Sequence, residues 1–156
     1  MIVALQRVDW SLLLLFGGLF VVMQGVAKSG LAALAVSGVA GPLAESGPRV
    51  LAHLAGAVTL LSQAVSNVPA VLLLLPPLEA LPGGASPSLW LALAAFSTLA
   101  GNLTIIASVA NVIVFETAER SGVRVSFTEY FKAGLPITLA TLALAWGWLS
   151  FLGNRR

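Results

Sequence analysis

The stretch SNVPA (residues 66–70) interrupts a long apolar run with amide and hydroxyl side chains rather than with charges. A second patch, GNLT (residues 101–104), does the same and is followed by AN at residues 110–111. In hydrocarbon an unpaired polar group is costly, so Pro, Gly and Asn breaks are tolerated only where they line a cavity enclosed by protein. The two patches therefore predict a binding site built from interrupted helices.

The composition around these patches predicts an integral membrane protein. Of the 156 residues, 58% are hydrophobic and 9% are charged, with a mean hydropathy of +0.99. Soluble proteins carry roughly a quarter charged residues. The formal net charge of +2 forms no basic stripe suited to a phosphate backbone, which excludes nucleic acid as a partner and leaves the lipid bilayer.

The charge-free intervals predict an all-α, polytopic transmembrane protein that forms one domain over residues 1–156. Residues 10–28 have the length of a first membrane span. Residues 31–43 are short for a crossing and predict a short or partial span.

The first patch predicts a re-entrant hairpin. A helix over residues 50–65 would reach only ~24 Å and one over residues 70–75 much less, because a helix rises about 1.5 Å per residue. Neither arm crosses a ~30 Å core alone, so we expect the patch to form the hairpin tip. The Pro- and Gly-rich residues 76–87 predict a surface loop.

The second patch predicts a broken helix. Residues 89–115 are uncharged and would extend ~40 Å as one straight helix, so the Gly-Asn pair at residues 101–102 is the natural break. Residues 116–132 predict a solvated connection, and residues 133–152 a final span with Pro136 in its first turn. Basic residues favour a cytoplasmic connection, but Arg155 and Arg156 then lie on the opposite side, which leaves the orientation open.

The chemistry of the patches favours binding over catalysis. His53 is the single histidine and has no acid or second ligand beside it in sequence, so we predict no catalytic residue, no resident metal and no cofactor. Carbonyl and hydroxyl oxygens suit Na⁺ as a coupling ion, and half-helix N-termini suit an anion. Helix capping and polar contacts between packed helices remain alternatives for these side chains. The candidate ion- and substrate-binding residues are Ser66, Asn67, Gly101, Asn102, Thr104, Ser108 and Asn111.

SNVPAVLLLLP (66–76) and GNLTIIASVANVIVFETAERSGVRVSFTEYFKAGLPIT (101–138) resemble the ion-transporter superfamily, which includes arsenite-pump proteins, citrate-transporter-like permeases and sodium-coupled dicarboxylate carriers. The opening VDWSLLLLFGGLFVV (8–22) is similar to the helix that begins the second half of such permeases. The resemblance implies that Ser66 and Asn67 form the hairpin-tip motif of half an ion and substrate site. Dicarboxylate carriers have a Ser-Asn-Thr tip, whereas Val68 here has no hydroxyl, which favours the arsenite-pump and anion-permease branch.

The family carries two inverted repeats, and this chain has one set of motifs, as a C-terminal half would. The resemblance thus implies half of a multi-pass permease of the inner (plasma) membrane that moves a small inorganic or organic anion by alternating access. Its partner would be a second copy of the chain or a separate N-terminal half. The alternatives are half of a sodium–proton antiporter, which would depend on Glu116, and a non-transporting packing module or fragment.

Overall fold

The computed structural model describes residues 10–30, 43 and 47–153, and regular structure in these ranges is entirely helical. This confirms the predicted all-α class. The predicted short span over residues 31–43 lies outside the described residues except for Leu43. The elements are α2 (Trp10–Lys28), α4 (Pro48–Val65), α5 (Asn67–Glu79), α6 (Pro87–Ala100), the 3₁₀ helix η1 (Ile105–Ala107), α7 (Val109–Arg120) and α8 (Phe127–Gly153).

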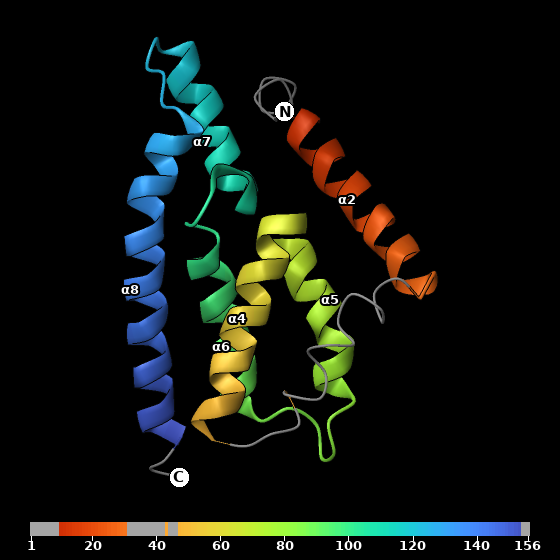
Figure 1. The fold of residues 1–156 in the computed structure, drawn as a ribbon. Coiled ribbons are helices and arrows are strands. Elements are labelled where there is room, and N and C mark those ends of the chain that lie inside the picture. The colour runs from red at the N-terminus through yellow and green to blue at the C-terminus, as the bar shows by residue number, and fades with distance from the viewer. Residues whose placement is uncertain (1–9, 31–42, 44–46, 154–156) are drawn as a thin grey trace, which may run out of the picture.

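Helix α4 packs against α5, α6 and α8 to form the bundle shown in Figure 1. Its buried residues recur at helical spacing, and Leu54 and Val58 are fully enclosed. Phe96 of α6 and Leu74 of α5 complete the centre of the same apolar core. Helix α2 packs against α5 at the side of the bundle.

Helices α4 and α5 form an antiparallel hairpin that turns through a single residue, Ser66 (Figure 1). The prediction that a loop begins at Pro76 was wrong, since α5 continues through Pro76 and Pro77 and ends at Glu79. Each proline removes one backbone donor. Burial of Leu74 and Leu78, one turn apart on the core face, holds the helix together across the two prolines.

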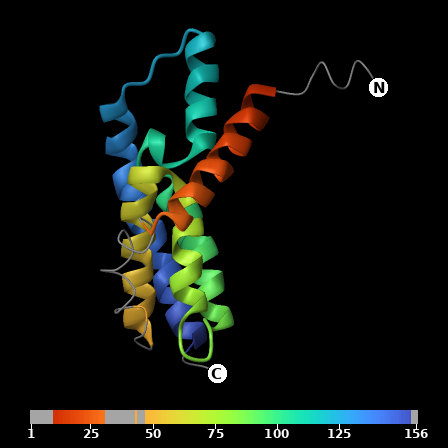
Figure 2. The same ribbon diagram turned by 90° about the vertical axis from the view of Figure 1, so that its right-hand side faces the viewer.

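The second long apolar stretch is broken as predicted, but over a longer segment. Helix α6 ends at Ala100 and α7 begins at Val109, with only the short η1 between them. The interruption, which we call the break, is therefore residues 101–108. Beyond it, α7 extends past the hairpin tip toward the upper end of the molecule (Figure 2).

The final helix starts earlier than predicted. Ser126 and Glu129 form a capping box, in which the Ser126 N–H donates to Glu129 Oε2 (2.8 Å) and the Glu129 N–H to Ser126 Oγ (3.2 Å). This cap starts α8 at Phe127 rather than at 133. Since α7 also continues to Arg120, only residues 121–126 of the predicted solvated connection lie outside a helix. Pro136 consequently lies inside the helix and not in its first turn.

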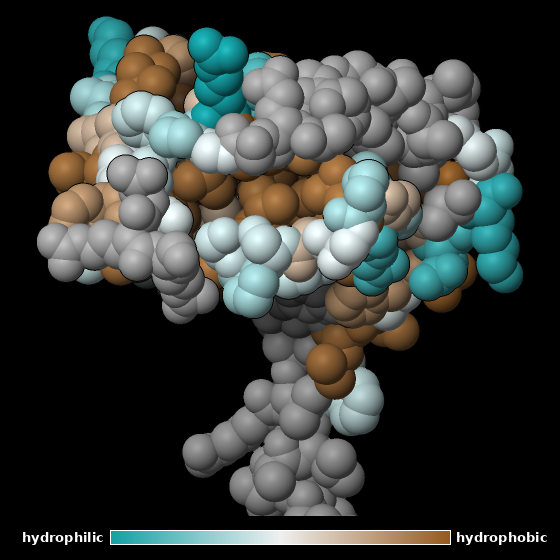
Figure 3. Space-filling view, turned by 90° about the horizontal axis from the view of Figure 1, so that it is seen from below, coloured by the Kyte–Doolittle hydropathy of each residue, from teal (hydrophilic) through white to brown (hydrophobic). Residues whose placement is uncertain are grey.

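Among the described helices, α8 is the one both long enough and apolar enough to cross a membrane, and α5 and α6 are apolar but shorter. Little of α8 is buried within the protein: one face, with Gly134, Thr138 and Leu149, packs inward, whereas Leu144 and Trp148 are exposed. The surface at the end where α8 terminates shows a hydrophobic area bordered by polar residues (Figure 3). The outer face of α8 is thus suited to lipid.

Candidate functional site

The hairpin tip and the break lie against each other, although about forty residues of sequence separate them. The Ser66 hydroxyl donates to the Ala107 carbonyl at 3.4 Å, and the Thr104 hydroxyl donates to Gln63 Oε1 at 2.7 Å. The two residues of each pair are 41 positions apart in the chain. The two patches that the sequence singled out therefore form one polar region between α4, α5, α6 and α7.

Asn67 opens helix α5 at the hairpin tip. Its side-chain Oδ1 accepts the Val68 N–H at 2.9 Å, and its Nδ2 lies 3.6 Å from the position that a Cβ on Gly101 would occupy. The side chain thus turns its acceptor toward its own helix and its donor toward the break. A Cβ at 101 would meet Asn67 at ordinary contact distance but would lie only 3.2 Å from the Ser108 Cβ and from the Thr98 carbonyl oxygen.

Asn111, in the first turn of α7, holds the break from the other side. Its Nδ2 donates to the Gly101 carbonyl at 2.6 Å and to the Thr104 carbonyl at 3.2 Å. Both carbonyls belong to the unwound segment, where the chain itself supplies fewer partners than a continuous helix does. Asn111 therefore replaces helical hydrogen bonds that the break has lost.

Ser108 and Asn102 are brought to the same region mainly through their backbones. Ser108 is the N-cap position of α7, and its Cβ lies 3.2 Å from the position that a Cβ on Gly101 would occupy. The Asn102 carbonyl faces α8 at Gly134. All seven predicted residues therefore lie at the tip or in and beside the break.

The sequence reasoning missed Gln63, which connects the hairpin to the break. Its Nε2 donates to the Ala100 carbonyl at 3.3 Å, at the end of α6, and to the Thr59 carbonyl at 3.1 Å, while its Oε1 accepts from Thr104. A signal was present in the sequence: Gln63 is an amide within an apolar stretch, three residues before the tip.

Two buried hydroxyls were also missed. Ser62 in α4 and Thr138 in α8 are almost completely buried, and their hydroxyl oxygens have no hydrogen-bond partner in the described part of the protein. Ser62 lies one turn before Ser66, whose N–H donates to the Ser62 carbonyl at 3.0 Å. A buried hydroxyl without a partner is costly, so such oxygens are candidates for contacting an ion or water.

Helix ends determine the electrostatics of the region. Helices α5 and α7 both begin here, and neither has an N-cap side chain bonded to its first turn. They run in opposite directions away from the region, so their N-terminal ends face each other (Figure 1). Because the helix dipole makes an N-terminus favourable for negative charge, the two ends together favour a negative ligand.

The C-terminal ends of α4 and α6 lie at the same level and present backbone carbonyls. Carbonyl oxygens suit hard cations such as Na⁺. Across the described residues, no three His, Asp or Glu side chains group as a metal site would require. Helix N-termini, which suit anions, and backbone carbonyls, which suit monovalent cations, thus lie close together in this region.

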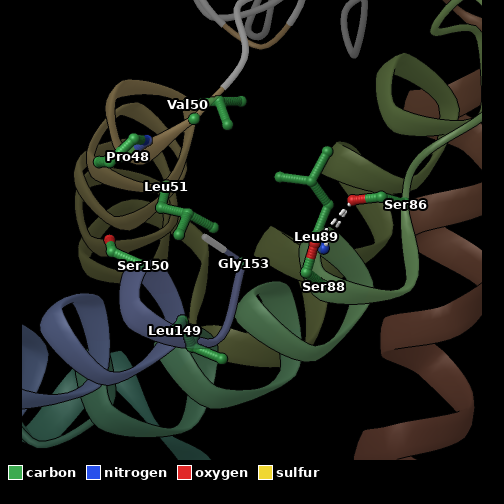
Figure 4. A pocket seen from close by; sticks show the side chains of 10 residues that line it. Pro48, Val50, Leu51, Ser86, Ser88, Leu89, Leu149, Ser150 and Gly153 are labelled. Carbon is green, nitrogen blue, oxygen red and sulfur yellow. Dashed lines mark hydrogen bonds between the residues drawn. The ribbon is translucent and has the colours of Figure 1, made fainter. Parts of the chain in front are cut away.

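A separate cavity lies at the other end of the bundle, where α4 and α6 begin and α8 ends (Figure 4). It has a volume of about 270 Å³ and is lined by apolar residues such as Leu51 and Leu89 together with Ser86 and Ser88. The Ser86 hydroxyl there accepts the Leu89 N–H and so caps α6. None of the seven predicted residues lines this cavity, and it is not the candidate site.

Known proteins resemble this chain along most of its length. Residues 1–95 match the model of the citrate transporter family CitMHS. The silicon efflux transporter LSI3 of Oryza sativa is 38% identical over 90% of the chain, and a putative transporter, arsB, of Dictyostelium discoideum is 38% identical over 90%. A 46 kDa membrane protein of Mycobacterium leprae is 31% identical over 95%.

The chain spans only part of these relatives, covering 30% of the rice protein, 25% of the Dictyostelium protein and 36% of the Mycobacterium protein. No solved structure matches. The matches confirm the resemblance to ion-transporter permeases that the tip and break motifs indicated. They also identify a multi-pass membrane protein related to transporters.

Proposed function

The chain belongs to the citrate transporter family, and from this membership we propose that it binds a small anion at the tip and break and carries it across the plasma membrane by alternating access. The observation that carries the proposal is the pair of facing N-termini, those of α5 and α7, held together by the bond between Ser66 and Ala107. This arrangement concentrates positive potential on one spot without using a charged side chain.

We propose Na⁺ as the coupling ion. The carbonyl ends of α4 and α6 and the unpaired hydroxyl of Ser62 supply oxygen atoms beside the anion position. Neutral ligands leave the charge of Na⁺ unbalanced, so an anion bound beside it stabilises the ion electrostatically. Binding of either ion then favours the other, which is the coupling that ion-driven transport requires.

The names of the matched family and of the rice relative point to citrate and to silicon compounds. These share oxygen-rich acids as their chemical form. The Asn67 amide can donate a hydrogen bond to an acid oxygen, whereas Val68 gives the tip an apolar contact. We therefore propose a small oxyacid in its anionic form as the substrate class.

The proposed site is open on one side, because Ser66, Asn67 and Ser108 are each only partly buried. The chain also spans about a third or less of the relatives compared above. We propose that a second repeat completes the site, supplied by another copy of the chain in the opposite orientation or by a separate partner half. The inverted-repeat relation and the re-entrant position of the hairpin tip belong to this proposal.

The experiment is uptake of labelled arsenite, silicate, citrate and sulfate into proteoliposomes, with and without an inward Na⁺ gradient. Wild-type protein is compared with Asn67→Ala and with Gln24→Ala, which removes an exposed amide of α2 far from the break. We expect gradient-driven uptake that Asn67→Ala abolishes and Gln24→Ala retains. Equal uptake by both variants would place binding elsewhere, and no uptake by folded wild-type protein would mean that the chain needs a missing half.

The same vesicles separate anion transport from sodium–proton antiport. Glu116 lies at the exposed end of α7 and pairs with Arg120 at 2.5 Å, away from the break. Anion uptake should therefore survive Glu116→Gln. Loss of a pH-dependent sodium flux in this variant, without any anion uptake by the wild type, would favour antiport instead.

A further inference from the structure

Helix α8 touches the break without a side chain between them. Gly134 is buried, and a Cβ added to it would lie 2.5 Å from the Asn102 carbonyl oxygen and 2.8 Å from the Leu103 carbonyl oxygen. Both oxygens belong to the backbone, so no side-chain rotation can relieve the overlap. Only glycine allows α8 and the break to come this close.

One turn earlier, α8 contacts the start of α7, directly after the break. The Tyr130 hydroxyl lies near the side chain of Asn111, which in turn holds the carbonyls of Gly101 and Thr104. The Tyr130 ring also packs edge-on against Phe115 of α7, with ring centroids 5.4 Å apart. Helix α8 therefore contacts both ends of the segment that carries the candidate binding groups.

We propose that Gly134 and Tyr130 are positioning residues, through which α8 sets the distance between the break and the hairpin tip. This proposal rests on the proposed function, because that distance is the width of the space between the N-termini of α5 and α7. An alanine at 134 must move the break or α8 by about 1 Å to restore ordinary contact. Displacements of that size weaken an interaction that depends on several groups acting together.

The chain offers a matched control in the same helix. Gly147 has nothing within 4 Å of an added Cβ, so Gly147→Ala makes the same chemical change in α8 without a clash. Both substitutions also raise helix propensity equally. A difference in uptake or thiol reactivity between Gly134→Ala and Gly147→Ala therefore measures the effect of the contact between Gly134 and the break.

The first readout is the concentration dependence of uptake. We expect Gly134→Ala to raise KM at least tenfold and Tyr130→Phe to raise it about threefold, with Gly147→Ala unchanged. The melting temperature in detergent is measured alongside. An unchanged KM, with only the maximal rate falling in step with the melting temperature, would overturn the proposal and make Gly134 a packing residue.

The second readout does not require transport. The natural chain has no cysteine, so a Ser108→Cys protein carries a single thiol, placed in the break. We expect its rate of reaction with a water-soluble maleimide to change several-fold when Gly134→Ala or Tyr130→Phe is added, and to stay the same with Gly147→Ala. Equal rates in all backgrounds would overturn the proposal.

The two readouts keep this proposal separate from the proposed function. Absence of uptake in every protein, together with the expected change in thiol reactivity, would reject transport by the chain alone and support the positioning role. If Gly134→Ala does not fold, Tyr130→Phe decides, because it keeps the ring and its contact with Phe115. Wild-type values of both KM and thiol reactivity in Tyr130→Phe would then overturn the proposal.

Discussion

Ser66 has the backbone angles φ 72° and ψ 163°, which residues other than glycine rarely adopt. Such a conformation costs about 1–3 kcal/mol and persists where the surrounding structure enforces it. At Ser66 the conformation is imposed by α4 and α5, because Ser66 is the single residue that connects them. The hydroxyl that bridges to Ala107 is thus held in place at a cost in stability.

We expect Ser66→Gly to raise the melting temperature and to lower uptake. Glycine removes the backbone strain, and the lost hydroxyl bond is long, at 3.4 Å, so it contributes little to stability. Ser66→Ala is the control, since it loses the hydroxyl but keeps the strain. A Ser66→Gly protein that melts below Ser66→Ala would contradict the strain argument.

Thr104 provides a second test at this scale. Its side chain is buried, and its hydroxyl bond to Gln63 joins the break to the hairpin. Thr104→Val keeps the shape but leaves Gln63 Oε1 without its donor, which should lower the free energy of unfolding by about 1–3 kcal/mol. Thr98→Val is the matched control because the exposed Thr98 hydroxyl bonds only within its own helix. Thermal unfolding in detergent should show no comparable loss for the control.

At the scale of the elements, a helix can begin at a capping residue that the pattern of apolar residues does not reveal. Helix α8 begins at Phe127 because Ser126 caps it, well before the apolar run starts. We expect Ser126→Ala to increase amide hydrogen exchange in the first turn of α8, since it removes the cap of the exposed N–H groups. Thr128→Ala, in the same turn but outside the capping box, should leave exchange there unchanged. Equal protection in both variants would show that tertiary packing alone starts the helix.

At the scale of the whole molecule, the exposed face of α8 determines how the protein sits in lipid. Leu144 is 74% exposed in the middle of the apolar part of this helix. Leu144→Arg should reduce the fraction of protein recovered in the membrane, because an arginine at a helix centre costs about 2.5–3.5 kcal/mol on insertion. Thr128→Arg, at the helix end, should insert normally. Normal insertion of Leu144→Arg would mean that protein or water, and not lipid, covers this face.

The sequence by itself determined the membrane class and the all-helical fold, because long charge-free apolar stretches suffice for these. The transporter resemblance came from the motifs at residues 66–76 and 101–138. The sequence also located the ends of α2 and the start of the break. The sequence-based predictions of the loop after α5 and of the start of α8 were wrong. Helix α5 continues past its two prolines because its leucines are buried, and α8 starts earlier because Ser126 caps it.

Only the tertiary structure decided how the two patches combine. The bonds from Gln63 to Thr104 and from Ser66 to Ala107 each cross 41 residues of sequence, and no local spacing encodes them. The close approach of Gly134 to the break likewise depends on how α8 packs, because a glycine in an apolar helix has the same local pattern whether or not backbone atoms lie against it. Composition and spacing therefore established what kind of protein this is, whereas long-range packing established which groups face one another.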